Sequence, residues 1–185
     1  MKKLIAVLLV LAMMVMTTAV FAEAVGSKTS GDISGADVID VKGNKEANIV
    51  IEIVEPDEAV TALQTAIAAA VEAGDLSSVL PADILAAIPA DFLSAEKLAD
   101  NLKDMVALKA PGDGEGVESF TFGMELDTPY EEGEELCVLF NIIESGEWMM
   151  KDAVVKEGKV TITLNAEELG KILNKGLVAT LVFNK

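Results

Sequence analysis

The chain has 185 residues, with 31 acidic residues, 14 lysines, no arginine and no histidine, and its formal net charge is −17. Such a polyanion repels nucleic acids and anionic lipids, and without arginine it has no bidentate phosphate-binding side chain. The lack of histidine excludes Ser-His-Asp and Cys-His nucleophiles and histidine-ligated zinc. We therefore expect no nucleic-acid partner and no catalytic site of these kinds.

The N-terminus has the three parts of a secretory signal peptide. Lys2 and Lys3 precede an unbroken apolar run over 4–16, and a small-residue exit ends at Ala22. The run is shorter than the roughly 20 apolar residues of a membrane-spanning helix, so an uncleaved anchor is the weaker alternative. We expect cleavage after Ala22, with Ala24 as second choice, which removes two lysines and changes the net charge from −17 to −19. The mature chain is therefore expected to be secreted, and a partner could retain it at the cell surface.

The first part of the mature chain predicts a leader, two strands and a helix. Residues 23–36 are rich in Gly, Ser and Thr and have no apolar periodicity, which is typical of a flexible leader. Alternating apolar residues predict strands over 38–41 and 48–54. Pro56 begins a predicted helix with a regular apolar stripe, and Gly74 ends it.

Short helical segments are predicted next. Two similar segments, which begin at Pro81 and Pro89, each predict a tight helical turn. Ser94 is expected to cap a further helix that carries Leu102 and Met105 on its apolar face.

Beyond residue 105 the apolar periodicity changes from helical to alternating. Predicted strands cover residues 105–109, 117–126, 136–143 and 177–183. Two glycine-containing turns predict two-residue hairpins, and the turn at Gly146 would set Ile143 opposite Trp148. The turn at Gly158 would begin a second hairpin. A short helix is expected to start at the cap Asn165.

That short helix has a predicted capping box, in which Glu168 is the partner of Asn165. The helix is expected to end at Gly176 and to be followed by the last strand.

Four motifs follow one another in the C-terminal half, over residues 147–148, 153–155, 157–164 and 177–182. Their order resembles that of immunoglobulin-like β-sandwich modules in secreted and surface proteins of Gram-positive bacteria. The resemblance implies an antiparallel sandwich in which Trp148 fills the core, and an extracellular setting. Such modules usually position or display other domains, and the resemblance implies no catalytic residues.

Cys137 is the only cysteine, so no intramolecular disulfide can form. Because it lies in an apolar, strand-like run, we expect a buried small side chain, with an intermolecular disulfide or a reactive thiol as the alternative.

Carboxylates are the only plentiful reactive groups. Asp113 and Glu115 are weak calcium candidates, and a second acidic group lies over 131–135, because calcium prefers oxygen ligands. Neither group has the spacing of a calcium-binding loop, so solvated acidic turns are the main expectation, and no other cofactor is expected. A hydrolase that uses two carboxylates stays as an alternative, although one Trp and one Tyr are few aromatic residues for sugar binding.

These expectations combine into one α+β interpretation. A signal peptide over 1–22 and a leader over 23–36 precede one interrupted domain over 37–185, with a separate N-terminal lobe as the alternative. Within it a helical segment over 57–103 packs against an antiparallel immunoglobulin-like β-sandwich over 105–185. The expected function is a non-catalytic secreted or surface-associated module that binds an extracellular protein or glycan, or displays other domains. The alternatives are a small carboxylate-dependent hydrolase and a calcium-dependent adhesion module.

Overall fold

The structure is a computed structural model that describes residues 36–88 and 102–184. The signal peptide with its cleavage site at Ala22, the leader before residue 36, the helical turn expected at Pro89 and the first part of the helix expected from Ser94 lie outside the described residues. Among the helices that are described, none has the length and apolar character needed to cross a membrane.

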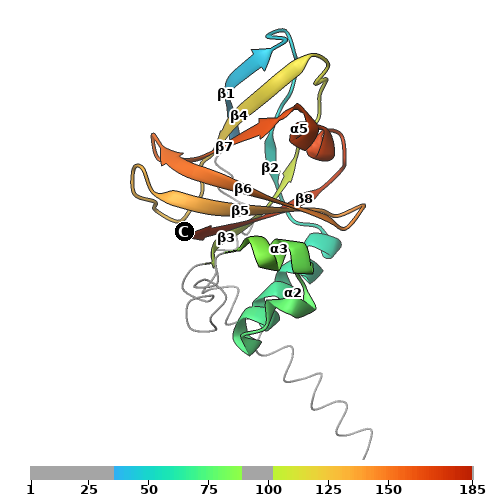
Figure 1. Ribbon diagram of the computed structural model, residues 1–185, viewed down its shortest axis with the longest axis vertical. Coiled ribbons are helices and arrows are strands. Elements are labelled where there is room, and N and C mark those ends of the chain that lie inside the picture. The colour runs from blue at the N-terminus through green and yellow to red at the C-terminus, as the bar shows by residue number, and fades with distance from the viewer. Residues whose placement is uncertain (1–35, 89–101, 185) are drawn as a thin grey trace, which may run out of the picture.

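The described residues form eight strands and four helical elements (Figure 1). The strands are β1 (Ala36–Gly43), β2 (Glu52–Val54), β3 (Leu102–Lys109), β4 (Val117–Met124), β5 (Glu135–Ile142), β6 (Glu147–Lys156), β7 (Lys159–Asn165) and β8 (Val178–Asn184). The helical elements are α2 (Glu58–Ala73), the 3₁₀ turn η1 (Leu76–Ser78), α3 (Ala82–Ala87) and α5 (Ala166–Ile172).

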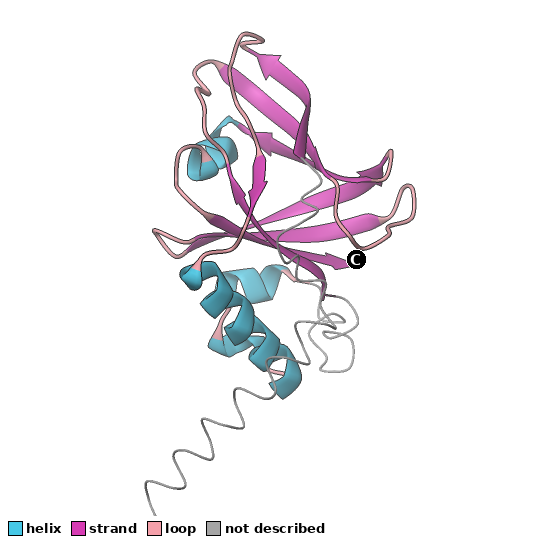
Figure 2. Cartoon of the chain, turned by 180° about the vertical axis from the view of Figure 1, so that it is seen from behind, coloured by secondary structure: helices cyan, strands magenta, loops and turns pink. Residues whose placement is uncertain are grey.

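All eight strands belong to one antiparallel sheet, in the order β1-β4-β7-β6-β5-β8-β3-β2. The sheet curls into a half-barrel, with short helices at one end and along one outer face (Figure 2). The predicted immunoglobulin-like β-sandwich is therefore wrong. A sandwich divides its strands between two sheets that are not hydrogen-bonded to each other, whereas here each strand is hydrogen-bonded to the next from one edge to the other.

The inner face of the curl holds the main apolar core. Phe120 and Phe122 on β4 are fully buried there, with ring centroids 5.8 Å apart. In the registers of β4 with β7, Phe120 lies opposite Leu164 and Phe122 opposite Ile162, and both partners are also fully buried. Along these strands, apolar side chains that face the core therefore alternate with side chains that face outward, as the sequence predicts.

Helices α2 and α3 cover the outer face of β5, β8 and β3 (Figure 1). Helix α2 begins where the Asp57 carboxylate accepts a hydrogen bond from the Val60 amide at 2.9 Å, and it ends at Gly74, whose φ is 67°. Its buried side chains, such as Ile67, pack with Leu139 of β5 in a second apolar cluster. Because these strands are covered on both faces, their sequences are almost continuously apolar.

Strand β3 corrects a helix prediction. Leu102 and Met105 lie on this strand, not on the expected helix. Met105 faces the helical layer and Val106 faces the barrel interior. Since both faces of β3 are buried, its apolar residues do not alternate with polar ones, and their spacing resembles a helical stripe.

The two hairpins differ in how well they were predicted. At Gly158 the register sets Val155 opposite Val160, as predicted, and Gly158 has a φ of 73°. At Gly146 the loop has four residues, and Trp148 lies opposite Asn141 rather than Ile143.

The longer loop arises because the Ile142 carbonyl accepts hydrogen bonds from the amides of Ser145 (3.2 Å) and Gly146 (2.7 Å). The predicted register is wrong by two residues, a shift that leaves every side chain on its own face. Trp148 is half-buried and packs with the helical layer outside the sheet, so it does not fill the barrel core.

Helix α5 closes one end of the half-barrel. Asn165 and Glu168 form the predicted capping box. The helix ends at Ile172, earlier than the predicted Gly176, because the Asn174 amide donates to the Ala110 carbonyl at 2.9 Å.

Candidate functional site

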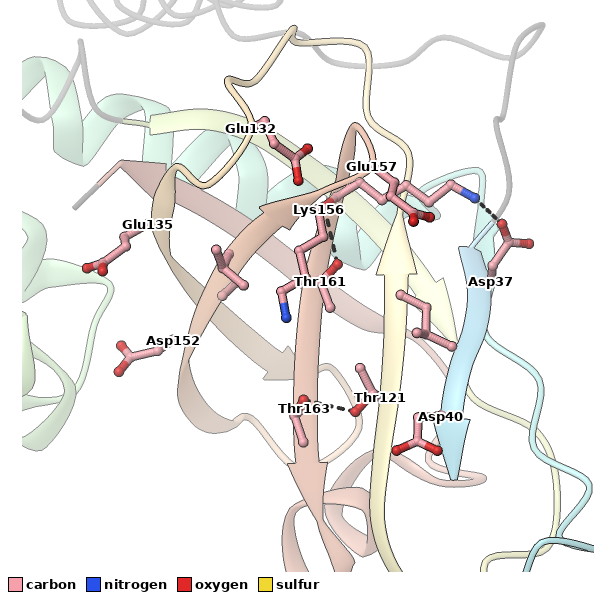
Figure 3. A pocket seen from close by; sticks show the side chains of 14 residues that line it. Asp37, Asp40, Thr121, Glu132, Glu135, Asp152, Lys156, Glu157, Thr161 and Thr163 are labelled. Carbon is pink, nitrogen blue, oxygen red and sulfur yellow. Dashed lines mark hydrogen bonds and ion pairs between the residues drawn. The ribbon is translucent and has the colours of Figure 1, made fainter. Parts of the chain in front are cut away.

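An open trough of about 1140 Å³ lies on the outer face of the sheet, over β1, β4, β7 and β6 (Figure 3). Its floor carries Thr121 of β4 and Thr161 and Thr163 of β7. The hydroxyl oxygens of Thr121 and Thr163, which face each other in register, lie 2.9 Å apart. These threonines face outward because the alternate positions on both strands are taken up by the apolar core.

Six carboxylates line the trough, and Figure 3 shows them on both sides of the threonine floor. They belong to Asp37, Asp40, Glu132, Glu135, Asp152 and Glu157. The only lysines among its lining residues are Lys156 and Lys159. The surface of the trough is therefore strongly negative.

A bulge in β1 places two of these carboxylates together. Asp37 lies opposite Gly123 and Asp40 opposite Thr121, and the register shifts at Ile39 between them. In a regular strand, residues three apart point to opposite faces, so without the bulge one of the two aspartates would face the barrel interior. The irregularity thus brings both carboxylates to the trough.

Lys159 of β7 reaches across β4 to form an ion pair with Asp37 of β1. Gly123 lies beneath this pair, and a Cβ atom there would be 3.0 Å from Ile39 Cδ1 and 3.1 Å from Lys159 Cβ. The glycine therefore leaves the space through which the lysine crosses. The hydrogen bond to Asp37 is the main cause that raises the pKa of Lys159 above its usual value.

The loop between β4 and β5, with the first residue of β5, carries carboxylates on the side of the trough opposite β1. The Gly133 amide donates to the Val155 carbonyl at 2.9 Å, and the Val155 amide donates to the Glu134 carbonyl at 2.9 Å. These bonds continue the pairing of β5 with β6 into the loop before β5, and so position the neighbouring Glu132 and Glu135.

A buried polar contact anchors the same loop to the barrel interior. Tyr130 donates its hydroxyl proton to Asp104 Oδ2 at 2.6 Å, and the Asp104 side chain, on β3, is 1 % exposed. Burial, followed by the hydrogen bond to Asp104 and the charge of that residue, raises the pKa of Tyr130 well above its usual value near 10. Tyr130 therefore stays protonated and keeps its role as a donor.

Sequence reasoning missed this contact. The available signal was a single acid directly before the apolar run over 105–108 in β3, since a buried carboxylate requires a partner.

The predicted calcium candidates lie elsewhere. Asp113 and Glu115 are exposed in the loop between β3 and β4, where the Glu115 amide donates to Asp113 Oδ1 at 3.0 Å. Among the described residues, no group of three or more His, Cys, Asp or Glu side chains is arranged to hold a metal ion. The second predicted acidic group, 131–135, contributes Glu132 and Glu135 to the trough.

The remaining predicted residues lie in the apolar layer under the helices or in turns, outside the trough. Cys137 is 5 % exposed and lies on the outer face of β5, beneath the helical layer. Gly146 and Gly158 are exposed turn residues with positive φ, and Trp148 lies at the edge of the helical layer. None of these four lines the trough.

Comparisons with known proteins found no match. No protein-family model matches the chain. No curated protein and no solved structure matches it either.

Proposed function

We propose that this chain is an exported, non-catalytic binding module that takes a cationic ligand into the trough. The observation that carries the proposal is the imbalance of charge there, six carboxylates against two lysines, one of which is already paired with Asp37. Carboxylates accept charge-assisted hydrogen bonds from ammonium and guanidinium groups. The ligand chemistry is therefore a protonated amine or guanidinium, carried by a protein segment or an amine-bearing glycan.

Two further features support this proposal. The signal peptide predicted from the sequence would place the module among extracellular ligands. The net charge of −19 expected after cleavage would raise the rate at which cationic ligands reach the trough.

A binding role is favoured over hydrolysis by the shape of the site. Hydrolases enclose the reacting bond so that fixed protein groups replace water around it. The trough instead lies open along a sheet face, and threonine hydroxyls form its floor. Such a surface suits contact with a long ligand.

The test uses the chain from residue 23 and four probes in matched pairs. Hexalysine is compared with hexaglutamate, and the fully deacetylated chitin hexamer with its neutral acetylated form, by isothermal titration. We expect one or both cationic probes to bind and neither of their counterparts to do so. Binding should weaken at least tenfold from about 0.05 M to about 0.5 M salt, since the Debye length shrinks.

The trough itself is tested by a triple variant, Asp40→Asn, Glu132→Gln and Glu135→Gln. We expect it to weaken binding of the cationic probe at least tenfold, because three acceptors of the site are neutralised.

The control is a triple variant with the same change of charge at exposed carboxylates outside the trough, Glu52→Gln, Glu72→Gln and Glu118→Gln. It should weaken binding less than twofold. Failure of every cationic probe to bind, or equal weakening by the two triples, would refute the proposal.

A further inference from the structure

Strand β1 has one edge with which no described strand pairs. It ends the strand order of the sheet and is hydrogen-bonded to β4 alone among the described strands. It has eight residues, so its free edge extends about 26 Å at roughly 3.3 Å per residue. An edge of this length can pair with an added strand.

The opposite edge of the sheet is less suited to pairing. Strand β2 has three residues, and short edge strands are one way in which proteins prevent added pairing.

Exposed apolar side chains also concentrate on β1. Among the described residues the exposed large hydrophobic side chains are Val38 (43 %), Ile39 (52 %) and Val50 (44 %), and two of these three lie on this strand. A strand added beside β1 would remove part of that apolar surface from water.

Charge determines which strand this edge accepts. Asp37 and Asp40 face the trough from β1, and successive side chains of an added strand would point alternately to the trough face and away from it. Basic side chains at alternate positions would therefore meet these carboxylates.

A second copy of the chain is a poor occupant by the same reasoning. Pairing of two β1 edges would bring the Asp37 and Asp40 carboxylates of both copies together, and like charges opposite each other destabilise a strand pair. Each copy also carries a large net negative charge.

From this edge and its charge we infer that the ligand of the trough is an extended segment of a partner protein, basic at alternate positions, which adds to the sheet as a strand beside β1. The inference rests on the proposed function and specifies it. Main-chain hydrogen bonds to β1 would supply affinity, and the carboxylates of the trough would select the basic side chains.

Strand addition is tested with an eight-residue peptide of alternating lysine and threonine. Two further forms carry N-methyl groups, on the lysine amides in one and on the threonine amides in the other, and their charge is unchanged. Alternate amides of a strand point to opposite edges, so pairing with β1 uses only one of the two sets. We expect one methylated form to lose at least tenfold in affinity and the other to bind within about threefold of the parent.

Hydrogen exchange locates the peptide on the chain. Amides of β1 should exchange at least tenfold more slowly in its presence, whereas amides of β3 should not change. The Asp40→Lys variant should bind at least tenfold more weakly, and its control Glu118→Lys, at an exposed position outside the trough, less than threefold.

The outcomes separate the two proposals. If the peptide binds but both methylated forms bind like the parent, or if β1 gains no protection, strand addition is refuted and the cationic trough stands. If neither this peptide nor the cationic probes bind, the proposed function is refuted as well.

Discussion

The two halves of the sheet differ in what covers their outer face. In the covered half, β5, β8 and β3, the helical layer packs outside and the barrel core packs inside, so both faces are apolar. In the open half, β1, β4 and β7, the inner face is equally apolar, but the outer face carries threonines, lysines and carboxylates in contact with water.

The difference indicates how each half is stabilised. The covered half depends on apolar volume buried on two sides. Beside the open half, polar contacts add to this apolar packing: Tyr130 of the loop between β4 and β5 bonds to Asp104 on β3, and Glu168 of α5 pairs with Lys151 of β6. Three substitutions test this contrast.

The largest effect is expected for Leu139→Ala in the covered half. Leu139 is fully buried between β5 and the helical layer, so its truncation removes apolar contacts and leaves a cavity. We expect a loss of about 3 kcal/mol in the free energy of unfolding, measured by urea titration.

The matched variant for Leu139→Ala is Thr163→Ala, on the outer face of β7. Thr163 is exposed, and its truncation should change the free energy of unfolding by about 0.5 kcal/mol or less. Equal losses for these two variants would show that the halves do not differ.

A smaller effect is expected for Tyr130→Phe, because it leaves the buried Asp104 carboxylate without its hydroxyl donor. We expect a loss of about 2 kcal/mol at neutral pH. The loss should depend on pH, since the folded state raises the pKa of Tyr130 above that of the unfolded chain.

Above pH 10 or so, the unfolded chain releases the phenol proton while the folded chain keeps it. The parent should then lose about 1.4 kcal/mol per pH unit from this group, and the variant should not. The stability difference between the two chains should therefore narrow with rising pH. Because Tyr130 is the only tyrosine, tyrosinate absorbance reports its ionisation directly. A difference that stays constant up to pH 11 or so would contradict this account.

The smallest effect of the three tested substitutions, controls aside, is expected for Glu168→Gln. Glutamine preserves the capping box but removes the charge that contacts Lys151 Nζ at 2.9 Å. Because this ion pair is only partly buried, we expect a loss of about 1 kcal/mol at neutral pH, measured by thermal unfolding.

The effect of Glu168→Gln on stability should diminish as the pH falls, whereas that of Tyr130→Phe should diminish as the pH rises. Burial acts to raise the pKa of Glu168, but hydrogen bonds from Lys151 and the Asn165 amide, with the charges of Lys151 and Lys171, outweigh it and lower the pKa. The stabilisation is therefore present above the unfolded value near 4.3 and is lost as pH falls below it. The control is Glu167→Gln, whose side chain is 84 % exposed and should alter stability little. A difference from the parent that persists at pH 2 or so would contradict the assignment.

Local features of this chain were predictable because each depends on neighbours in sequence. The end of α2 at Gly74, the capping box at Asn165 and the turn at Gly158 all follow from residue types at fixed spacing. The start of α2 was predicted less well, at Pro56 rather than after the cap Asp57. The inward position of Phe120 also follows from the sequence, because alternation assigns each residue of a strand to a face.

Other features depend on residues far apart in the chain. The trough joins β1 to the loop between β4 and β5, and Tyr130 meets an aspartate 26 positions away. No local sequence pattern indicates that Asp37 and Glu135 line the same trough. Likewise the bulge at Ile39, which turns Asp37 and Asp40 to the same side, is visible only in the register with β4.

The sequence by itself therefore determined most of the strands, the faces of their residues and the turn at Gly158, since these follow from backbone geometry and residue preference. Only the tertiary structure decided which strands are neighbours, with β8 between β5 and β3, and β1 beside β4. Alternation specifies the face of a residue but not the partner of a strand, so the same pattern suits a sandwich and a curled sheet. In the part of the chain that the structure describes, the single curled sheet leaves the outer face of β1, β4 and β7, and one edge of β1, without a covering element.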